Sequence, residues 1–322
     1  MLRELVSLYG PSGREGAVAD YIENKLKPYA DVSRDSMGNV IAHIKGEGKK
    51  LMLAAHMDEI GIMVTYIEDK GFLRFVPVGG LSPMAVLYQK VKFKNGVIGV
   101  IACSEDIEPK DMKIKDMYID IGADSKASAQ KKVQIGDMAG FYSEFICQGD
   151  IVTTGKADDR IGCFMLLSLA EKIKNPSYDL YLVFTVQEEV GLRGATPSAF
   201  SVNPDIAIAV DVTDTGDTPS APAMAVEMGK GIAIKIKDGR MVTSEEIVAL
   251  LENTAKKENI PYQFEVMTAG TTDGSVIQTS REGVPTGVIS VPCRYIHTPC
   301  ETFSLKDVEG GISLLEKIIN KG

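Results

Sequence analysis

Histidines and acidic residues that could bind metal ions occur in short groups along the chain. His56 is separated from Asp58 by one residue, and Glu188 and Glu189 are adjacent. Two imidazoles and several carboxylates form a ligand set that suits zinc, manganese or cobalt, and this set needs no cysteine. The residues concerned are His56, Asp58, Asp158, Asp159, Glu188, Glu189, Asp211 and His297.

The number of these residues favours a pair of metal ions. Even five ligands from this set would be too many for one tetrahedral ion. Five would suffice for two ions that share a carboxylate, and they would leave room for water. Ions about 3.5–4 Å apart can polarise a carbonyl group and lower the pKa of a water between them. A further carboxylate must then take the proton from that water. The pair Glu188 and Glu189 offers a ligand and a base at neighbouring positions.

Most of these residues follow apolar runs that are typical of buried strands. In open α/β sheets, sites form in the crevice beyond the carboxyl ends of the strands, so we expect the side chains to converge there. Asp158 precedes a helix predicted for residues 161–174 and can face the same crevice. The runs are 51–55 before His56, 180–186 before Glu188 and Glu189, 206–210 before Asp211, and 288–291 before His297.

The sequence pattern changes between residues 59 and 154. Glycines are frequent there and no long helical period occurs. Asn95-Gly96 indicates a hairpin between 91–94 and 97–100, because this pair supplies the two positive φ angles of a type I′ turn. We therefore predict a small β-rich insert at 59–154 and a larger domain formed by 1–58 and 155–322.

Strands and helices alternate in the larger domain, which predicts an α/β sandwich with a mixed or mostly parallel sheet. Two capping boxes, at 12–15 and 243–246, predict helix starts. Residues 231–237 alternate apolar and charged side chains, as in a half-exposed strand. Residues 305–319 have the period of a closing helix.

Composition narrows the possible partners and location. The net charge of −9 disfavours nucleic acid and anionic membrane surfaces, which attract basic patches. The apolar runs are too short to span a bilayer, and the N-terminus has no signal-peptide pattern. The five cysteines are scattered without a Cys-x-x-Cys pair, which favours a reducing cytoplasm.

Taken together, the motifs resemble the tetrahedral (TET) aminopeptidase family, whose relatives are labelled glutamyl, leucyl or deblocking aminopeptidase. The resemblance extends over essentially the whole chain, and the motifs occur in the family's order with similar gaps. They are His56-x-Asp58, Asp158-Asp159-Arg160-x-Gly162, Glu188-Glu189-x-Gly191, Asp211 and Arg294-x-x-His297-x-Pro299.

The resemblance implies a role for each site residue. Glu188 is implied as the general base, and Asp58 as the residue that orients the His56 ring. Asp214 and Asp217 lie close enough to Asp211 to replace it as a ligand, but the family pattern favours Asp211. The implied ligands are Asp158 bridging two divalent ions, His56 and Asp211 completing one site, and Glu189 and His297 completing the other.

The resemblance also implies a function and an assembly. It implies a zinc-peptidase-like three-layer α/β/α fold, a PDZ-like dimerisation insert, and dimers that assemble into tetrahedral dodecamers. The expected activity is removal of N-terminal residues from peptide substrates, with residues 270–274 lining the substrate pocket. The alternatives are a carboxypeptidase or N-acyl amino-acid deacylase on a related two-metal site, and a non-catalytic metal-stabilised scaffold. An endoglucanase is disfavoured because it would leave the histidines without a role.

Overall fold

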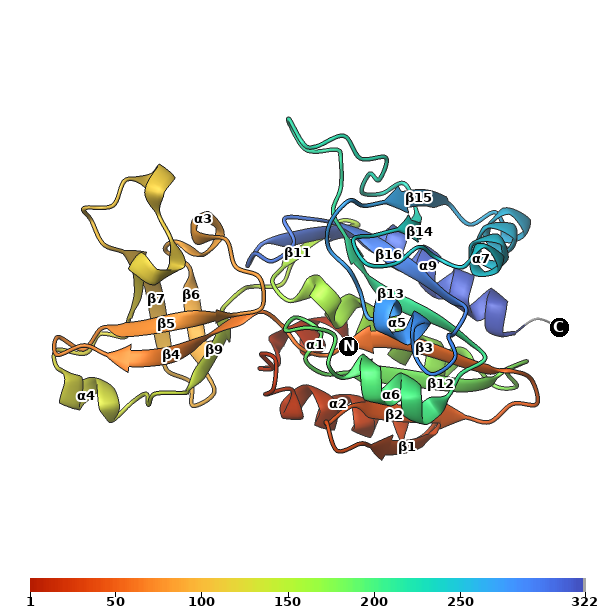
Figure 1. Ribbon diagram of the computed structural model, residues 1–322, viewed down its shortest axis with the longest axis horizontal. Coiled ribbons are helices and arrows are strands. Elements are labelled where there is room, and N and C mark those ends of the chain that lie inside the picture. Colours follow the sequence, from red (N-terminus) through yellow and green to blue (C-terminus); the bar gives the residue numbers. More distant parts are fainter. Residues whose placement is uncertain (321–322) are drawn as a thin grey trace.

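An 11-stranded mixed sheet lies at the centre of the larger part of the molecule (Figure 1). The computed structural model describes residues 1–320. The strands of this sheet are β1 (Asp31–Arg34), β2 (Val40–Ile44), β3 (Lys50–His56), β10 (Ile146–Gln148), β11 (Ile151–Thr154), β12 (Asp179–Thr185), β13 (Ile206–Thr213), β14 (Ile232–Lys237), β15 (Tyr262–Val266), β16 (Thr286–Arg294) and β17 (Glu301–Ser304).

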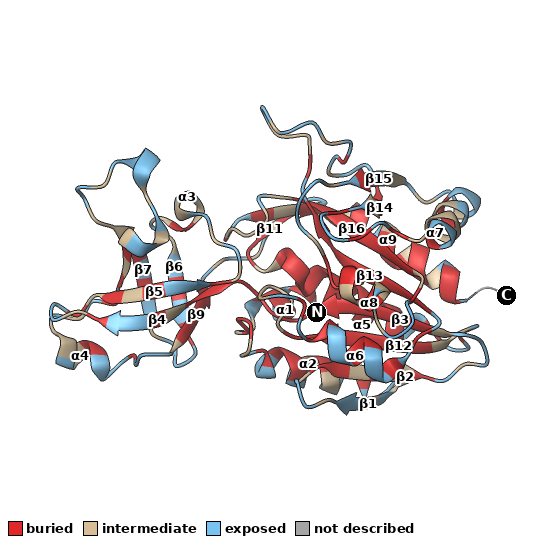
Figure 2. Cartoon of the chain, viewed as in Figure 1, coloured by how far each residue is buried: buried red, intermediate tan, exposed pale blue. Residues whose placement is uncertain are grey.

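The four middle strands, β12, β3, β13 and β16, lie side by side and run parallel. The flanking strands β2, β14 and β17 pair with them antiparallel. Figure 2 shows that β3, β13 and β16 are buried over almost their whole length. Parallel strands end on the same edge of a sheet, and this arrangement brings the carboxyl ends of β12, β3 and β13 together.

Helices cover both faces of the sheet. Alternate residues of β3 explain why, because Leu51 and Leu53 join the core shared with α5 and α9, whereas Met52 and Ala54 pack in the core beside α6. These layers confirm the predicted three-layer α/β/α fold. The helices are α1 (Leu2–Ser7), α2 (Gly16–Leu26), α5 (Ala157–Lys172), α6 (Ala195–Val202), α7 (Glu245–Glu258), α8 (Gly274–Gln278) and α9 (Leu305–Ile319).

A closed six-stranded barrel lies beside this body (Figure 1). Its apolar interior forms a core separate from that of the large sheet. The strands before and after it, β3 and β10, belong to the large sheet, so the barrel ends earlier than the predicted insert of 59–154. The barrel strands are β4 (Gly61–Ile67), β5 (Leu73–Val78), β6 (Lys90–Phe93), β7 (Ile98–Cys103), β8 (Met117–Asp120) and β9 (Met138–Phe141), with the short helices α3 (Pro83–Val86), η1 (Pro109–Asp111), η2 (Ile114–Asp116) and α4 (Lys126–Gln130).

Two local predictions about strands differ from the structure. β6 and β7 form the predicted hairpin, but only Gly96 of Asn95-Gly96 has a positive φ, so the predicted type I′ turn is wrong. β14 was expected to be half exposed, yet it is buried as far as Lys235. Lys235 is buried because it pairs with the buried carboxylate of Glu265 on the neighbouring strand.

Neither predicted capping box forms. α2 begins at Gly16 without a side-chain cap, and the Ser12 hydroxyl instead donates to the Asp58 carboxylate at 2.6 Å. In the second box, the Thr243 hydroxyl has no hydrogen-bond partner among the described residues, and the hydroxyl of Ser244, the residue before α7, accepts the backbone N–H of Thr286 at 3.1 Å. Both serines are therefore used in long-range contacts rather than in local capping. Among the described residues, no helix has the length and hydropathy of a membrane-spanning segment.

A buried arginine ties the start of α5 to the rest of the body. Arg160 is fully buried, and its guanidinium donates to the carbonyl oxygens of Met57 and Leu5, both at 2.7 Å. It also lies 3.7 Å from the carboxylate of Glu59. These contacts link the first turn of α5 with the end of β3 and with α1.

Replacement of Arg160 by alanine should lower the free energy of unfolding by about 3 kcal/mol, because it leaves buried acceptors without a donor and Glu59 without one of its cations. Urea unfolding of the metal-free protein measures this loss. Arg14→Ala is the control, since Arg14 is exposed, and it should change the free energy by less than about 0.5 kcal/mol. Equal losses in both variants would contradict the assigned role of Arg160.

Candidate active site

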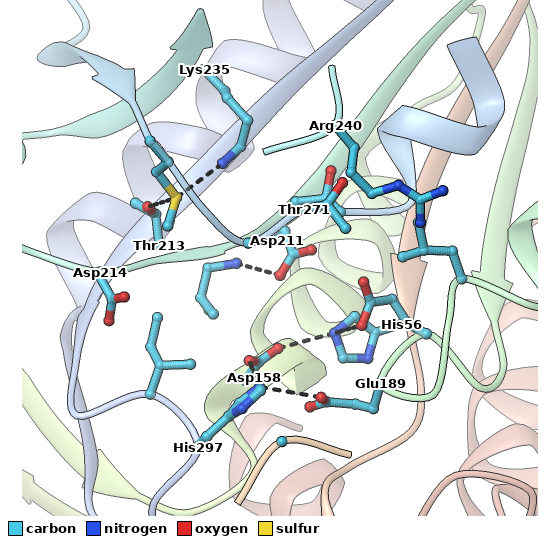
Figure 3. A pocket seen from close by; sticks show the side chains of 18 of the residues that line it. His56, Asp158, Glu189, Asp211, Thr213, Asp214, Lys235, Arg240, Thr271 and His297 are labelled. Carbon is cyan, nitrogen blue, oxygen red and sulfur yellow. Dashed lines mark hydrogen bonds and ion pairs between the residues drawn. The ribbon is translucent and has the colours of Figure 1, made fainter. Parts of the chain in front are cut away.

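The predicted site residues converge at the carboxyl edge of the parallel strands (Figure 3). His56 is the last residue of β3, and Asp211 lies near the end of β13. Glu188 and Glu189 follow β12, and His297 follows β16. Asp158 joins them from the first turn of α5. The residues come from five elements spread over more than 200 positions of the sequence, and the sheet topology, together with the position of α5, brings them together.

Asp158 is at the centre of the group. One of its carboxylate oxygens lies 3.0 Å from Nε2 of His56, and the other lies 3.4 Å from Nε2 of His297. His297 Nε2 is also 3.1 Å from a carboxylate oxygen of Glu189. The two oxygens of Asp158 thus face two different histidines, as a carboxylate shared by two neighbouring ions would.

Two groups of potential ligand atoms result. His56, Asp158 and Asp211 form one group, and Asp158, Glu189 and His297 form the other, with all atoms of a group within 4.8 Å of one another. These are the five residues predicted as ligands, and Asp158 belongs to both groups. Each group offers nitrogen and oxygen donors of the kind that zinc binds.

The two aspartates that could have replaced Asp211 have other surroundings. Asp217 accepts two hydrogen bonds from the Arg294 guanidinium, at 2.9 and 2.6 Å. Arg294, the first residue of the motif that contains His297, therefore points away from the ligand groups. Asp214 is exposed and lines the adjacent cavity, and it belongs to neither group.

Asp58 organises the residues around His56. It is fully buried and lies 3.4 Å from Nδ1 of His56, on the side of the ring opposite Asp158. It also accepts the backbone N–H groups of Glu188 and Glu189, at 2.9 and 3.2 Å, and the Ser12 hydroxyl. A carboxylate at Nδ1 fixes the orientation and tautomer of an imidazole whose Nε2 faces a metal.

The carboxylates are too close together to be charged without a compensating cation. Burial and the negative charge of Asp158 raise the pKa of Asp211 to about 8. Burial, with the charges of Asp211, Asp273 and Glu189, raises the pKa of Glu188 well above its ordinary value. Divalent ions would remove both effects, because an opposite charge nearby favours the ionised carboxylate.

The histidines show the complementary effect. Burial alone would lower the pKa of His297, but hydrogen bonds with Asp158 and Glu189 raise it to about 12. Burial would likewise lower the pKa of His56, but its contacts with Asp158 and Asp58 raise that pKa well above its ordinary value. In the buried interior, one carboxylate oxygen of Glu189 has no hydrogen-bond partner. Protons on the imidazoles thus take the place that cations would fill, and the donor set fits divalent metal ions.

A cavity of about 510 Å³ opens beside the ligand groups, and all five of their residues line it. Lys235 and Arg240 lie on its opposite wall (Figure 3). Thr271, from the segment 270–274 that was expected to line a substrate pocket, also lies there. The cavity is large enough for one amino-acid side chain and the peptide bond next to it.

The segment after β5 contributes Gly80 to the lining of the cavity, on the side of His297. A Cβ atom on residue 80 would lie 3.0 Å from Nδ1 of His297. Gly79 has a positive φ, and a Cβ there would lie 3.3 Å from a carboxylate oxygen of Glu189. The positive φ favours glycine at residue 79, and the close approach to His297 favours it at residue 80, where the segment after β5 passes the ligands.

Sequence reasoning missed several residues of the site. Glu301 is buried and accepts the backbone N–H groups of Asp158 and His297. Its position four residues after His297 is the only sequence signal, and it does not distinguish Glu301 from a surface residue. Lys235 was expected to be one of the charged residues of a half-exposed strand, and Ser12 was predicted to belong to a capping box.

Asp159, a candidate metal-binding residue in the sequence, belongs to neither ligand group, and its carboxylate contacts the backbone instead. Its side chain is fully buried. One carboxylate oxygen accepts the backbone N–H of His56 at 3.1 Å, and the other accepts that of Gly162 at 2.9 Å.

Comparisons with known proteins agree with the resemblance drawn from the motifs. The sequence matches the M42 glutamyl aminopeptidase family over residues 38–314. It is 48% identical to a putative aminopeptidase of Acetivibrio thermocellus, over 99% of this chain and 97% of that protein. An aminopeptidase structure from the archaeon Desulfurococcus kamchatkensis superposes with a TM-score of 0.96 at 39% identity, covering 100% of this chain and 94% of that chain.

A third comparison concerns assembly. The TET1 peptidase of Pyrococcus horikoshii, described as assembling into a tetrahedron or a large octahedral shell, superposes with a TM-score of 0.90 at 31% identity, covering 100% of this chain and 98% of that chain. The family model covers residues 38–314, and the relative and the two structures match 99–100% of the chain. The chain belongs to the M42 family of aminopeptidases, hydrolases that act on peptide bonds.

Proposed function

We propose that this enzyme removes N-terminal residues from peptides with two divalent metal ions held by His56, Asp158, Glu189, Asp211 and His297. The observation that carries the proposal is the position of Asp158, whose two carboxylate oxygens face His56 and His297 separately. A shared carboxylate of this kind is what a pair of ions requires. Zinc, cobalt and manganese all suit the donor set.

The ions would polarise the scissile carbonyl and lower the pKa of a water between them. Glu188 is the proposed general base, because it belongs to neither ligand group yet has a carboxylate oxygen 3.9 Å from Nε2 of His56. The backbone N–H of Glu188 donates to Asp58, and this hydrogen bond fixes the position from which the Glu188 side chain extends. The proton that Glu188 accepts from water is then available for the leaving amine.

The related alternative, an N-acyl amino-acid deacylase or carboxypeptidase, is not favoured by the family to which the chain belongs. A scaffold without turnover is also disfavoured, because a residue of the right type is present for each proposed role. We therefore propose that the substrates are peptides with a free N-terminal amino group.

For assembly we propose a homo-oligomer. The support is the TET1 peptidase of Pyrococcus horikoshii, which is described as forming a tetrahedron or an octahedral shell. The barrel at residues 61–141 is the proposed dimerisation unit, within the insert predicted for 59–154, and the dimers would build a tetrahedral dodecamer. The cytoplasm is the proposed location, on the basis of the scattered cysteines.

Metal removal and return test the two-ion proposal. Protein treated with a chelator should lose at least 95% of its activity on free-amine amino-acid anilides, and zinc, cobalt or manganese should restore it. The N-acetylated forms of the same anilides are the matched substrates, and they should remain uncleaved. Cleavage of the acetylated set alone would favour the deacylase, and full activity after verified metal removal would contradict the proposal.

Replacement of Glu188 by glutamine tests the assignment of the base. Glutamine keeps the shape but cannot accept the proton, so kcat should fall by about 10²–10⁴-fold while metal content stays at the wild-type level. Glu282→Gln is the matched control, since Glu282 is exposed outside the site, and its kcat should stay within twofold of wild type. Unchanged turnover in Glu188→Gln would show that another group acts as the base.

A further inference from the structure

Glu301 is a buried acid that none of the proposed roles uses. It is the first residue of β17, is 2% exposed, and lies opposite Thr154 at the end of β11. One of its carboxylate oxygens accepts the backbone N–H of Asp158 at 3.1 Å. The other accepts the backbone N–H of His297 at 3.0 Å. A single side chain thus holds the backbones of two proposed ligands.

The two residues that Glu301 holds have irregular backbones. His297 has a φ of 61°, in the left-handed region that a residue with a Cβ seldom adopts. Asp158 has a non-helical ψ of 111° and lies in the first turn of α5, where the N–H groups have no helical partner. Neither N–H belongs to a regular ladder, and each needs an acceptor from elsewhere.

No cationic side chain pairs with this carboxylate. Among residues 1–320, Glu301 forms no ion pair with a lysine, arginine or histidine, although Lys156 lines the same small cavity. The backbone N–H groups of Asp158 and His297 are therefore the partners that account for its burial.

We propose that Glu301 is a positioning residue for the metal site formed by Asp158, Glu189 and His297. It fixes the separation of Asp158 and His297 through their backbones. It does not touch the ion or the substrate. Because the other site takes His56 and Asp211 from β3 and β13, Glu301 acts on one site more than on the other. This inference rests on the proposed two-ion function.

The chain contains a close match for a control. Asp307, at the start of α9, is also buried, and its two oxygens accept the backbone N–H groups of Gly229 at 2.6 Å and Gly231 at 2.8 Å. Neither glycine is a proposed ligand. Asp307→Ala therefore removes the same kind of buried bridge as Glu301→Ala without altering the ligand groups.

The test is calorimetric titration of the metal-free proteins with zinc, with cobalt absorption spectra as a second readout of coordination. Wild type and Asp307→Ala should each bind two ions per chain. Glu301→Ala should bind one ion with affinity within threefold of wild type and the other about 10–100-fold more weakly. Glu301→Gln keeps the side-chain volume and one accepting oxygen, so its weaker site should lie between those of wild type and Glu301→Ala.

The outcomes separate the inference from the function on which it rests. Binding of two ions by Glu301→Ala with wild-type affinities would overturn the role of Glu301 alone. An equal loss in Asp307→Ala would also overturn it, because general destabilisation would then explain the effect. Wild-type protein that binds fewer than two ions would overturn the two-ion function itself. If Glu301→Ala does not fold, the same comparison is made between Glu301→Gln and Asp307→Asn.

Discussion

Buried negative charge is the constraint on which the site depends. Asp158, Asp211, Glu188 and Glu189 approach one another at one edge of the sheet, where removal of a carboxylate from water costs several kcal/mol for each ion. The two histidines near them cannot offset four charges, as the raised pKa of Asp211, about 8, indicates. A protein keeps such a group only where a cation or a proton compensates it. Because of this cost, the cluster as a whole strongly supports a metal centre, whereas one buried carboxylate alone would not.

A second set of carboxylates surrounds the first and acts on the backbone. Asp58 accepts the N–H groups of Glu188 and Glu189, Asp159 accepts that of His56, and Glu301 accepts those of Asp158 and His297. Ionised carboxylates suit this role because they only accept hydrogen bonds and can take two donors at once. Every ligand except Asp211 is thus held at its own backbone N–H by an acid, while Asp211 lies within a strand.

The local sequence pattern was sufficient to predict the sheet and the strand ends, whereas the choice of the five proposed ligands came from the resemblance of the motifs to a known family. The apolar runs before His56 and Asp211 are long enough to be recognised as buried strands, and the topology then brings their ends together. The contacts of Ser12, Lys235 and Glu301 could not be predicted in the same way. Each depends on a partner at least 30 positions away, so the same local sequence is also compatible with a helix cap or an exposed residue.

The barrel interrupts the chain between two ligands, and its attachment explains how the site tolerates this. Glu59, where the chain leaves the large sheet, accepts the backbone N–H of Gly10 and pairs with Lys156, which follows β11 after the chain has returned to that sheet. This pairing holds the two sides of the interruption together, and added length between them costs little, because closure entropy grows only slowly with loop length. Gly79 and Gly80 then bring part of that segment against Glu189 and His297. The inserted segment is therefore part of the wall of the active site, and a change in its orientation would alter the space beside the ligands.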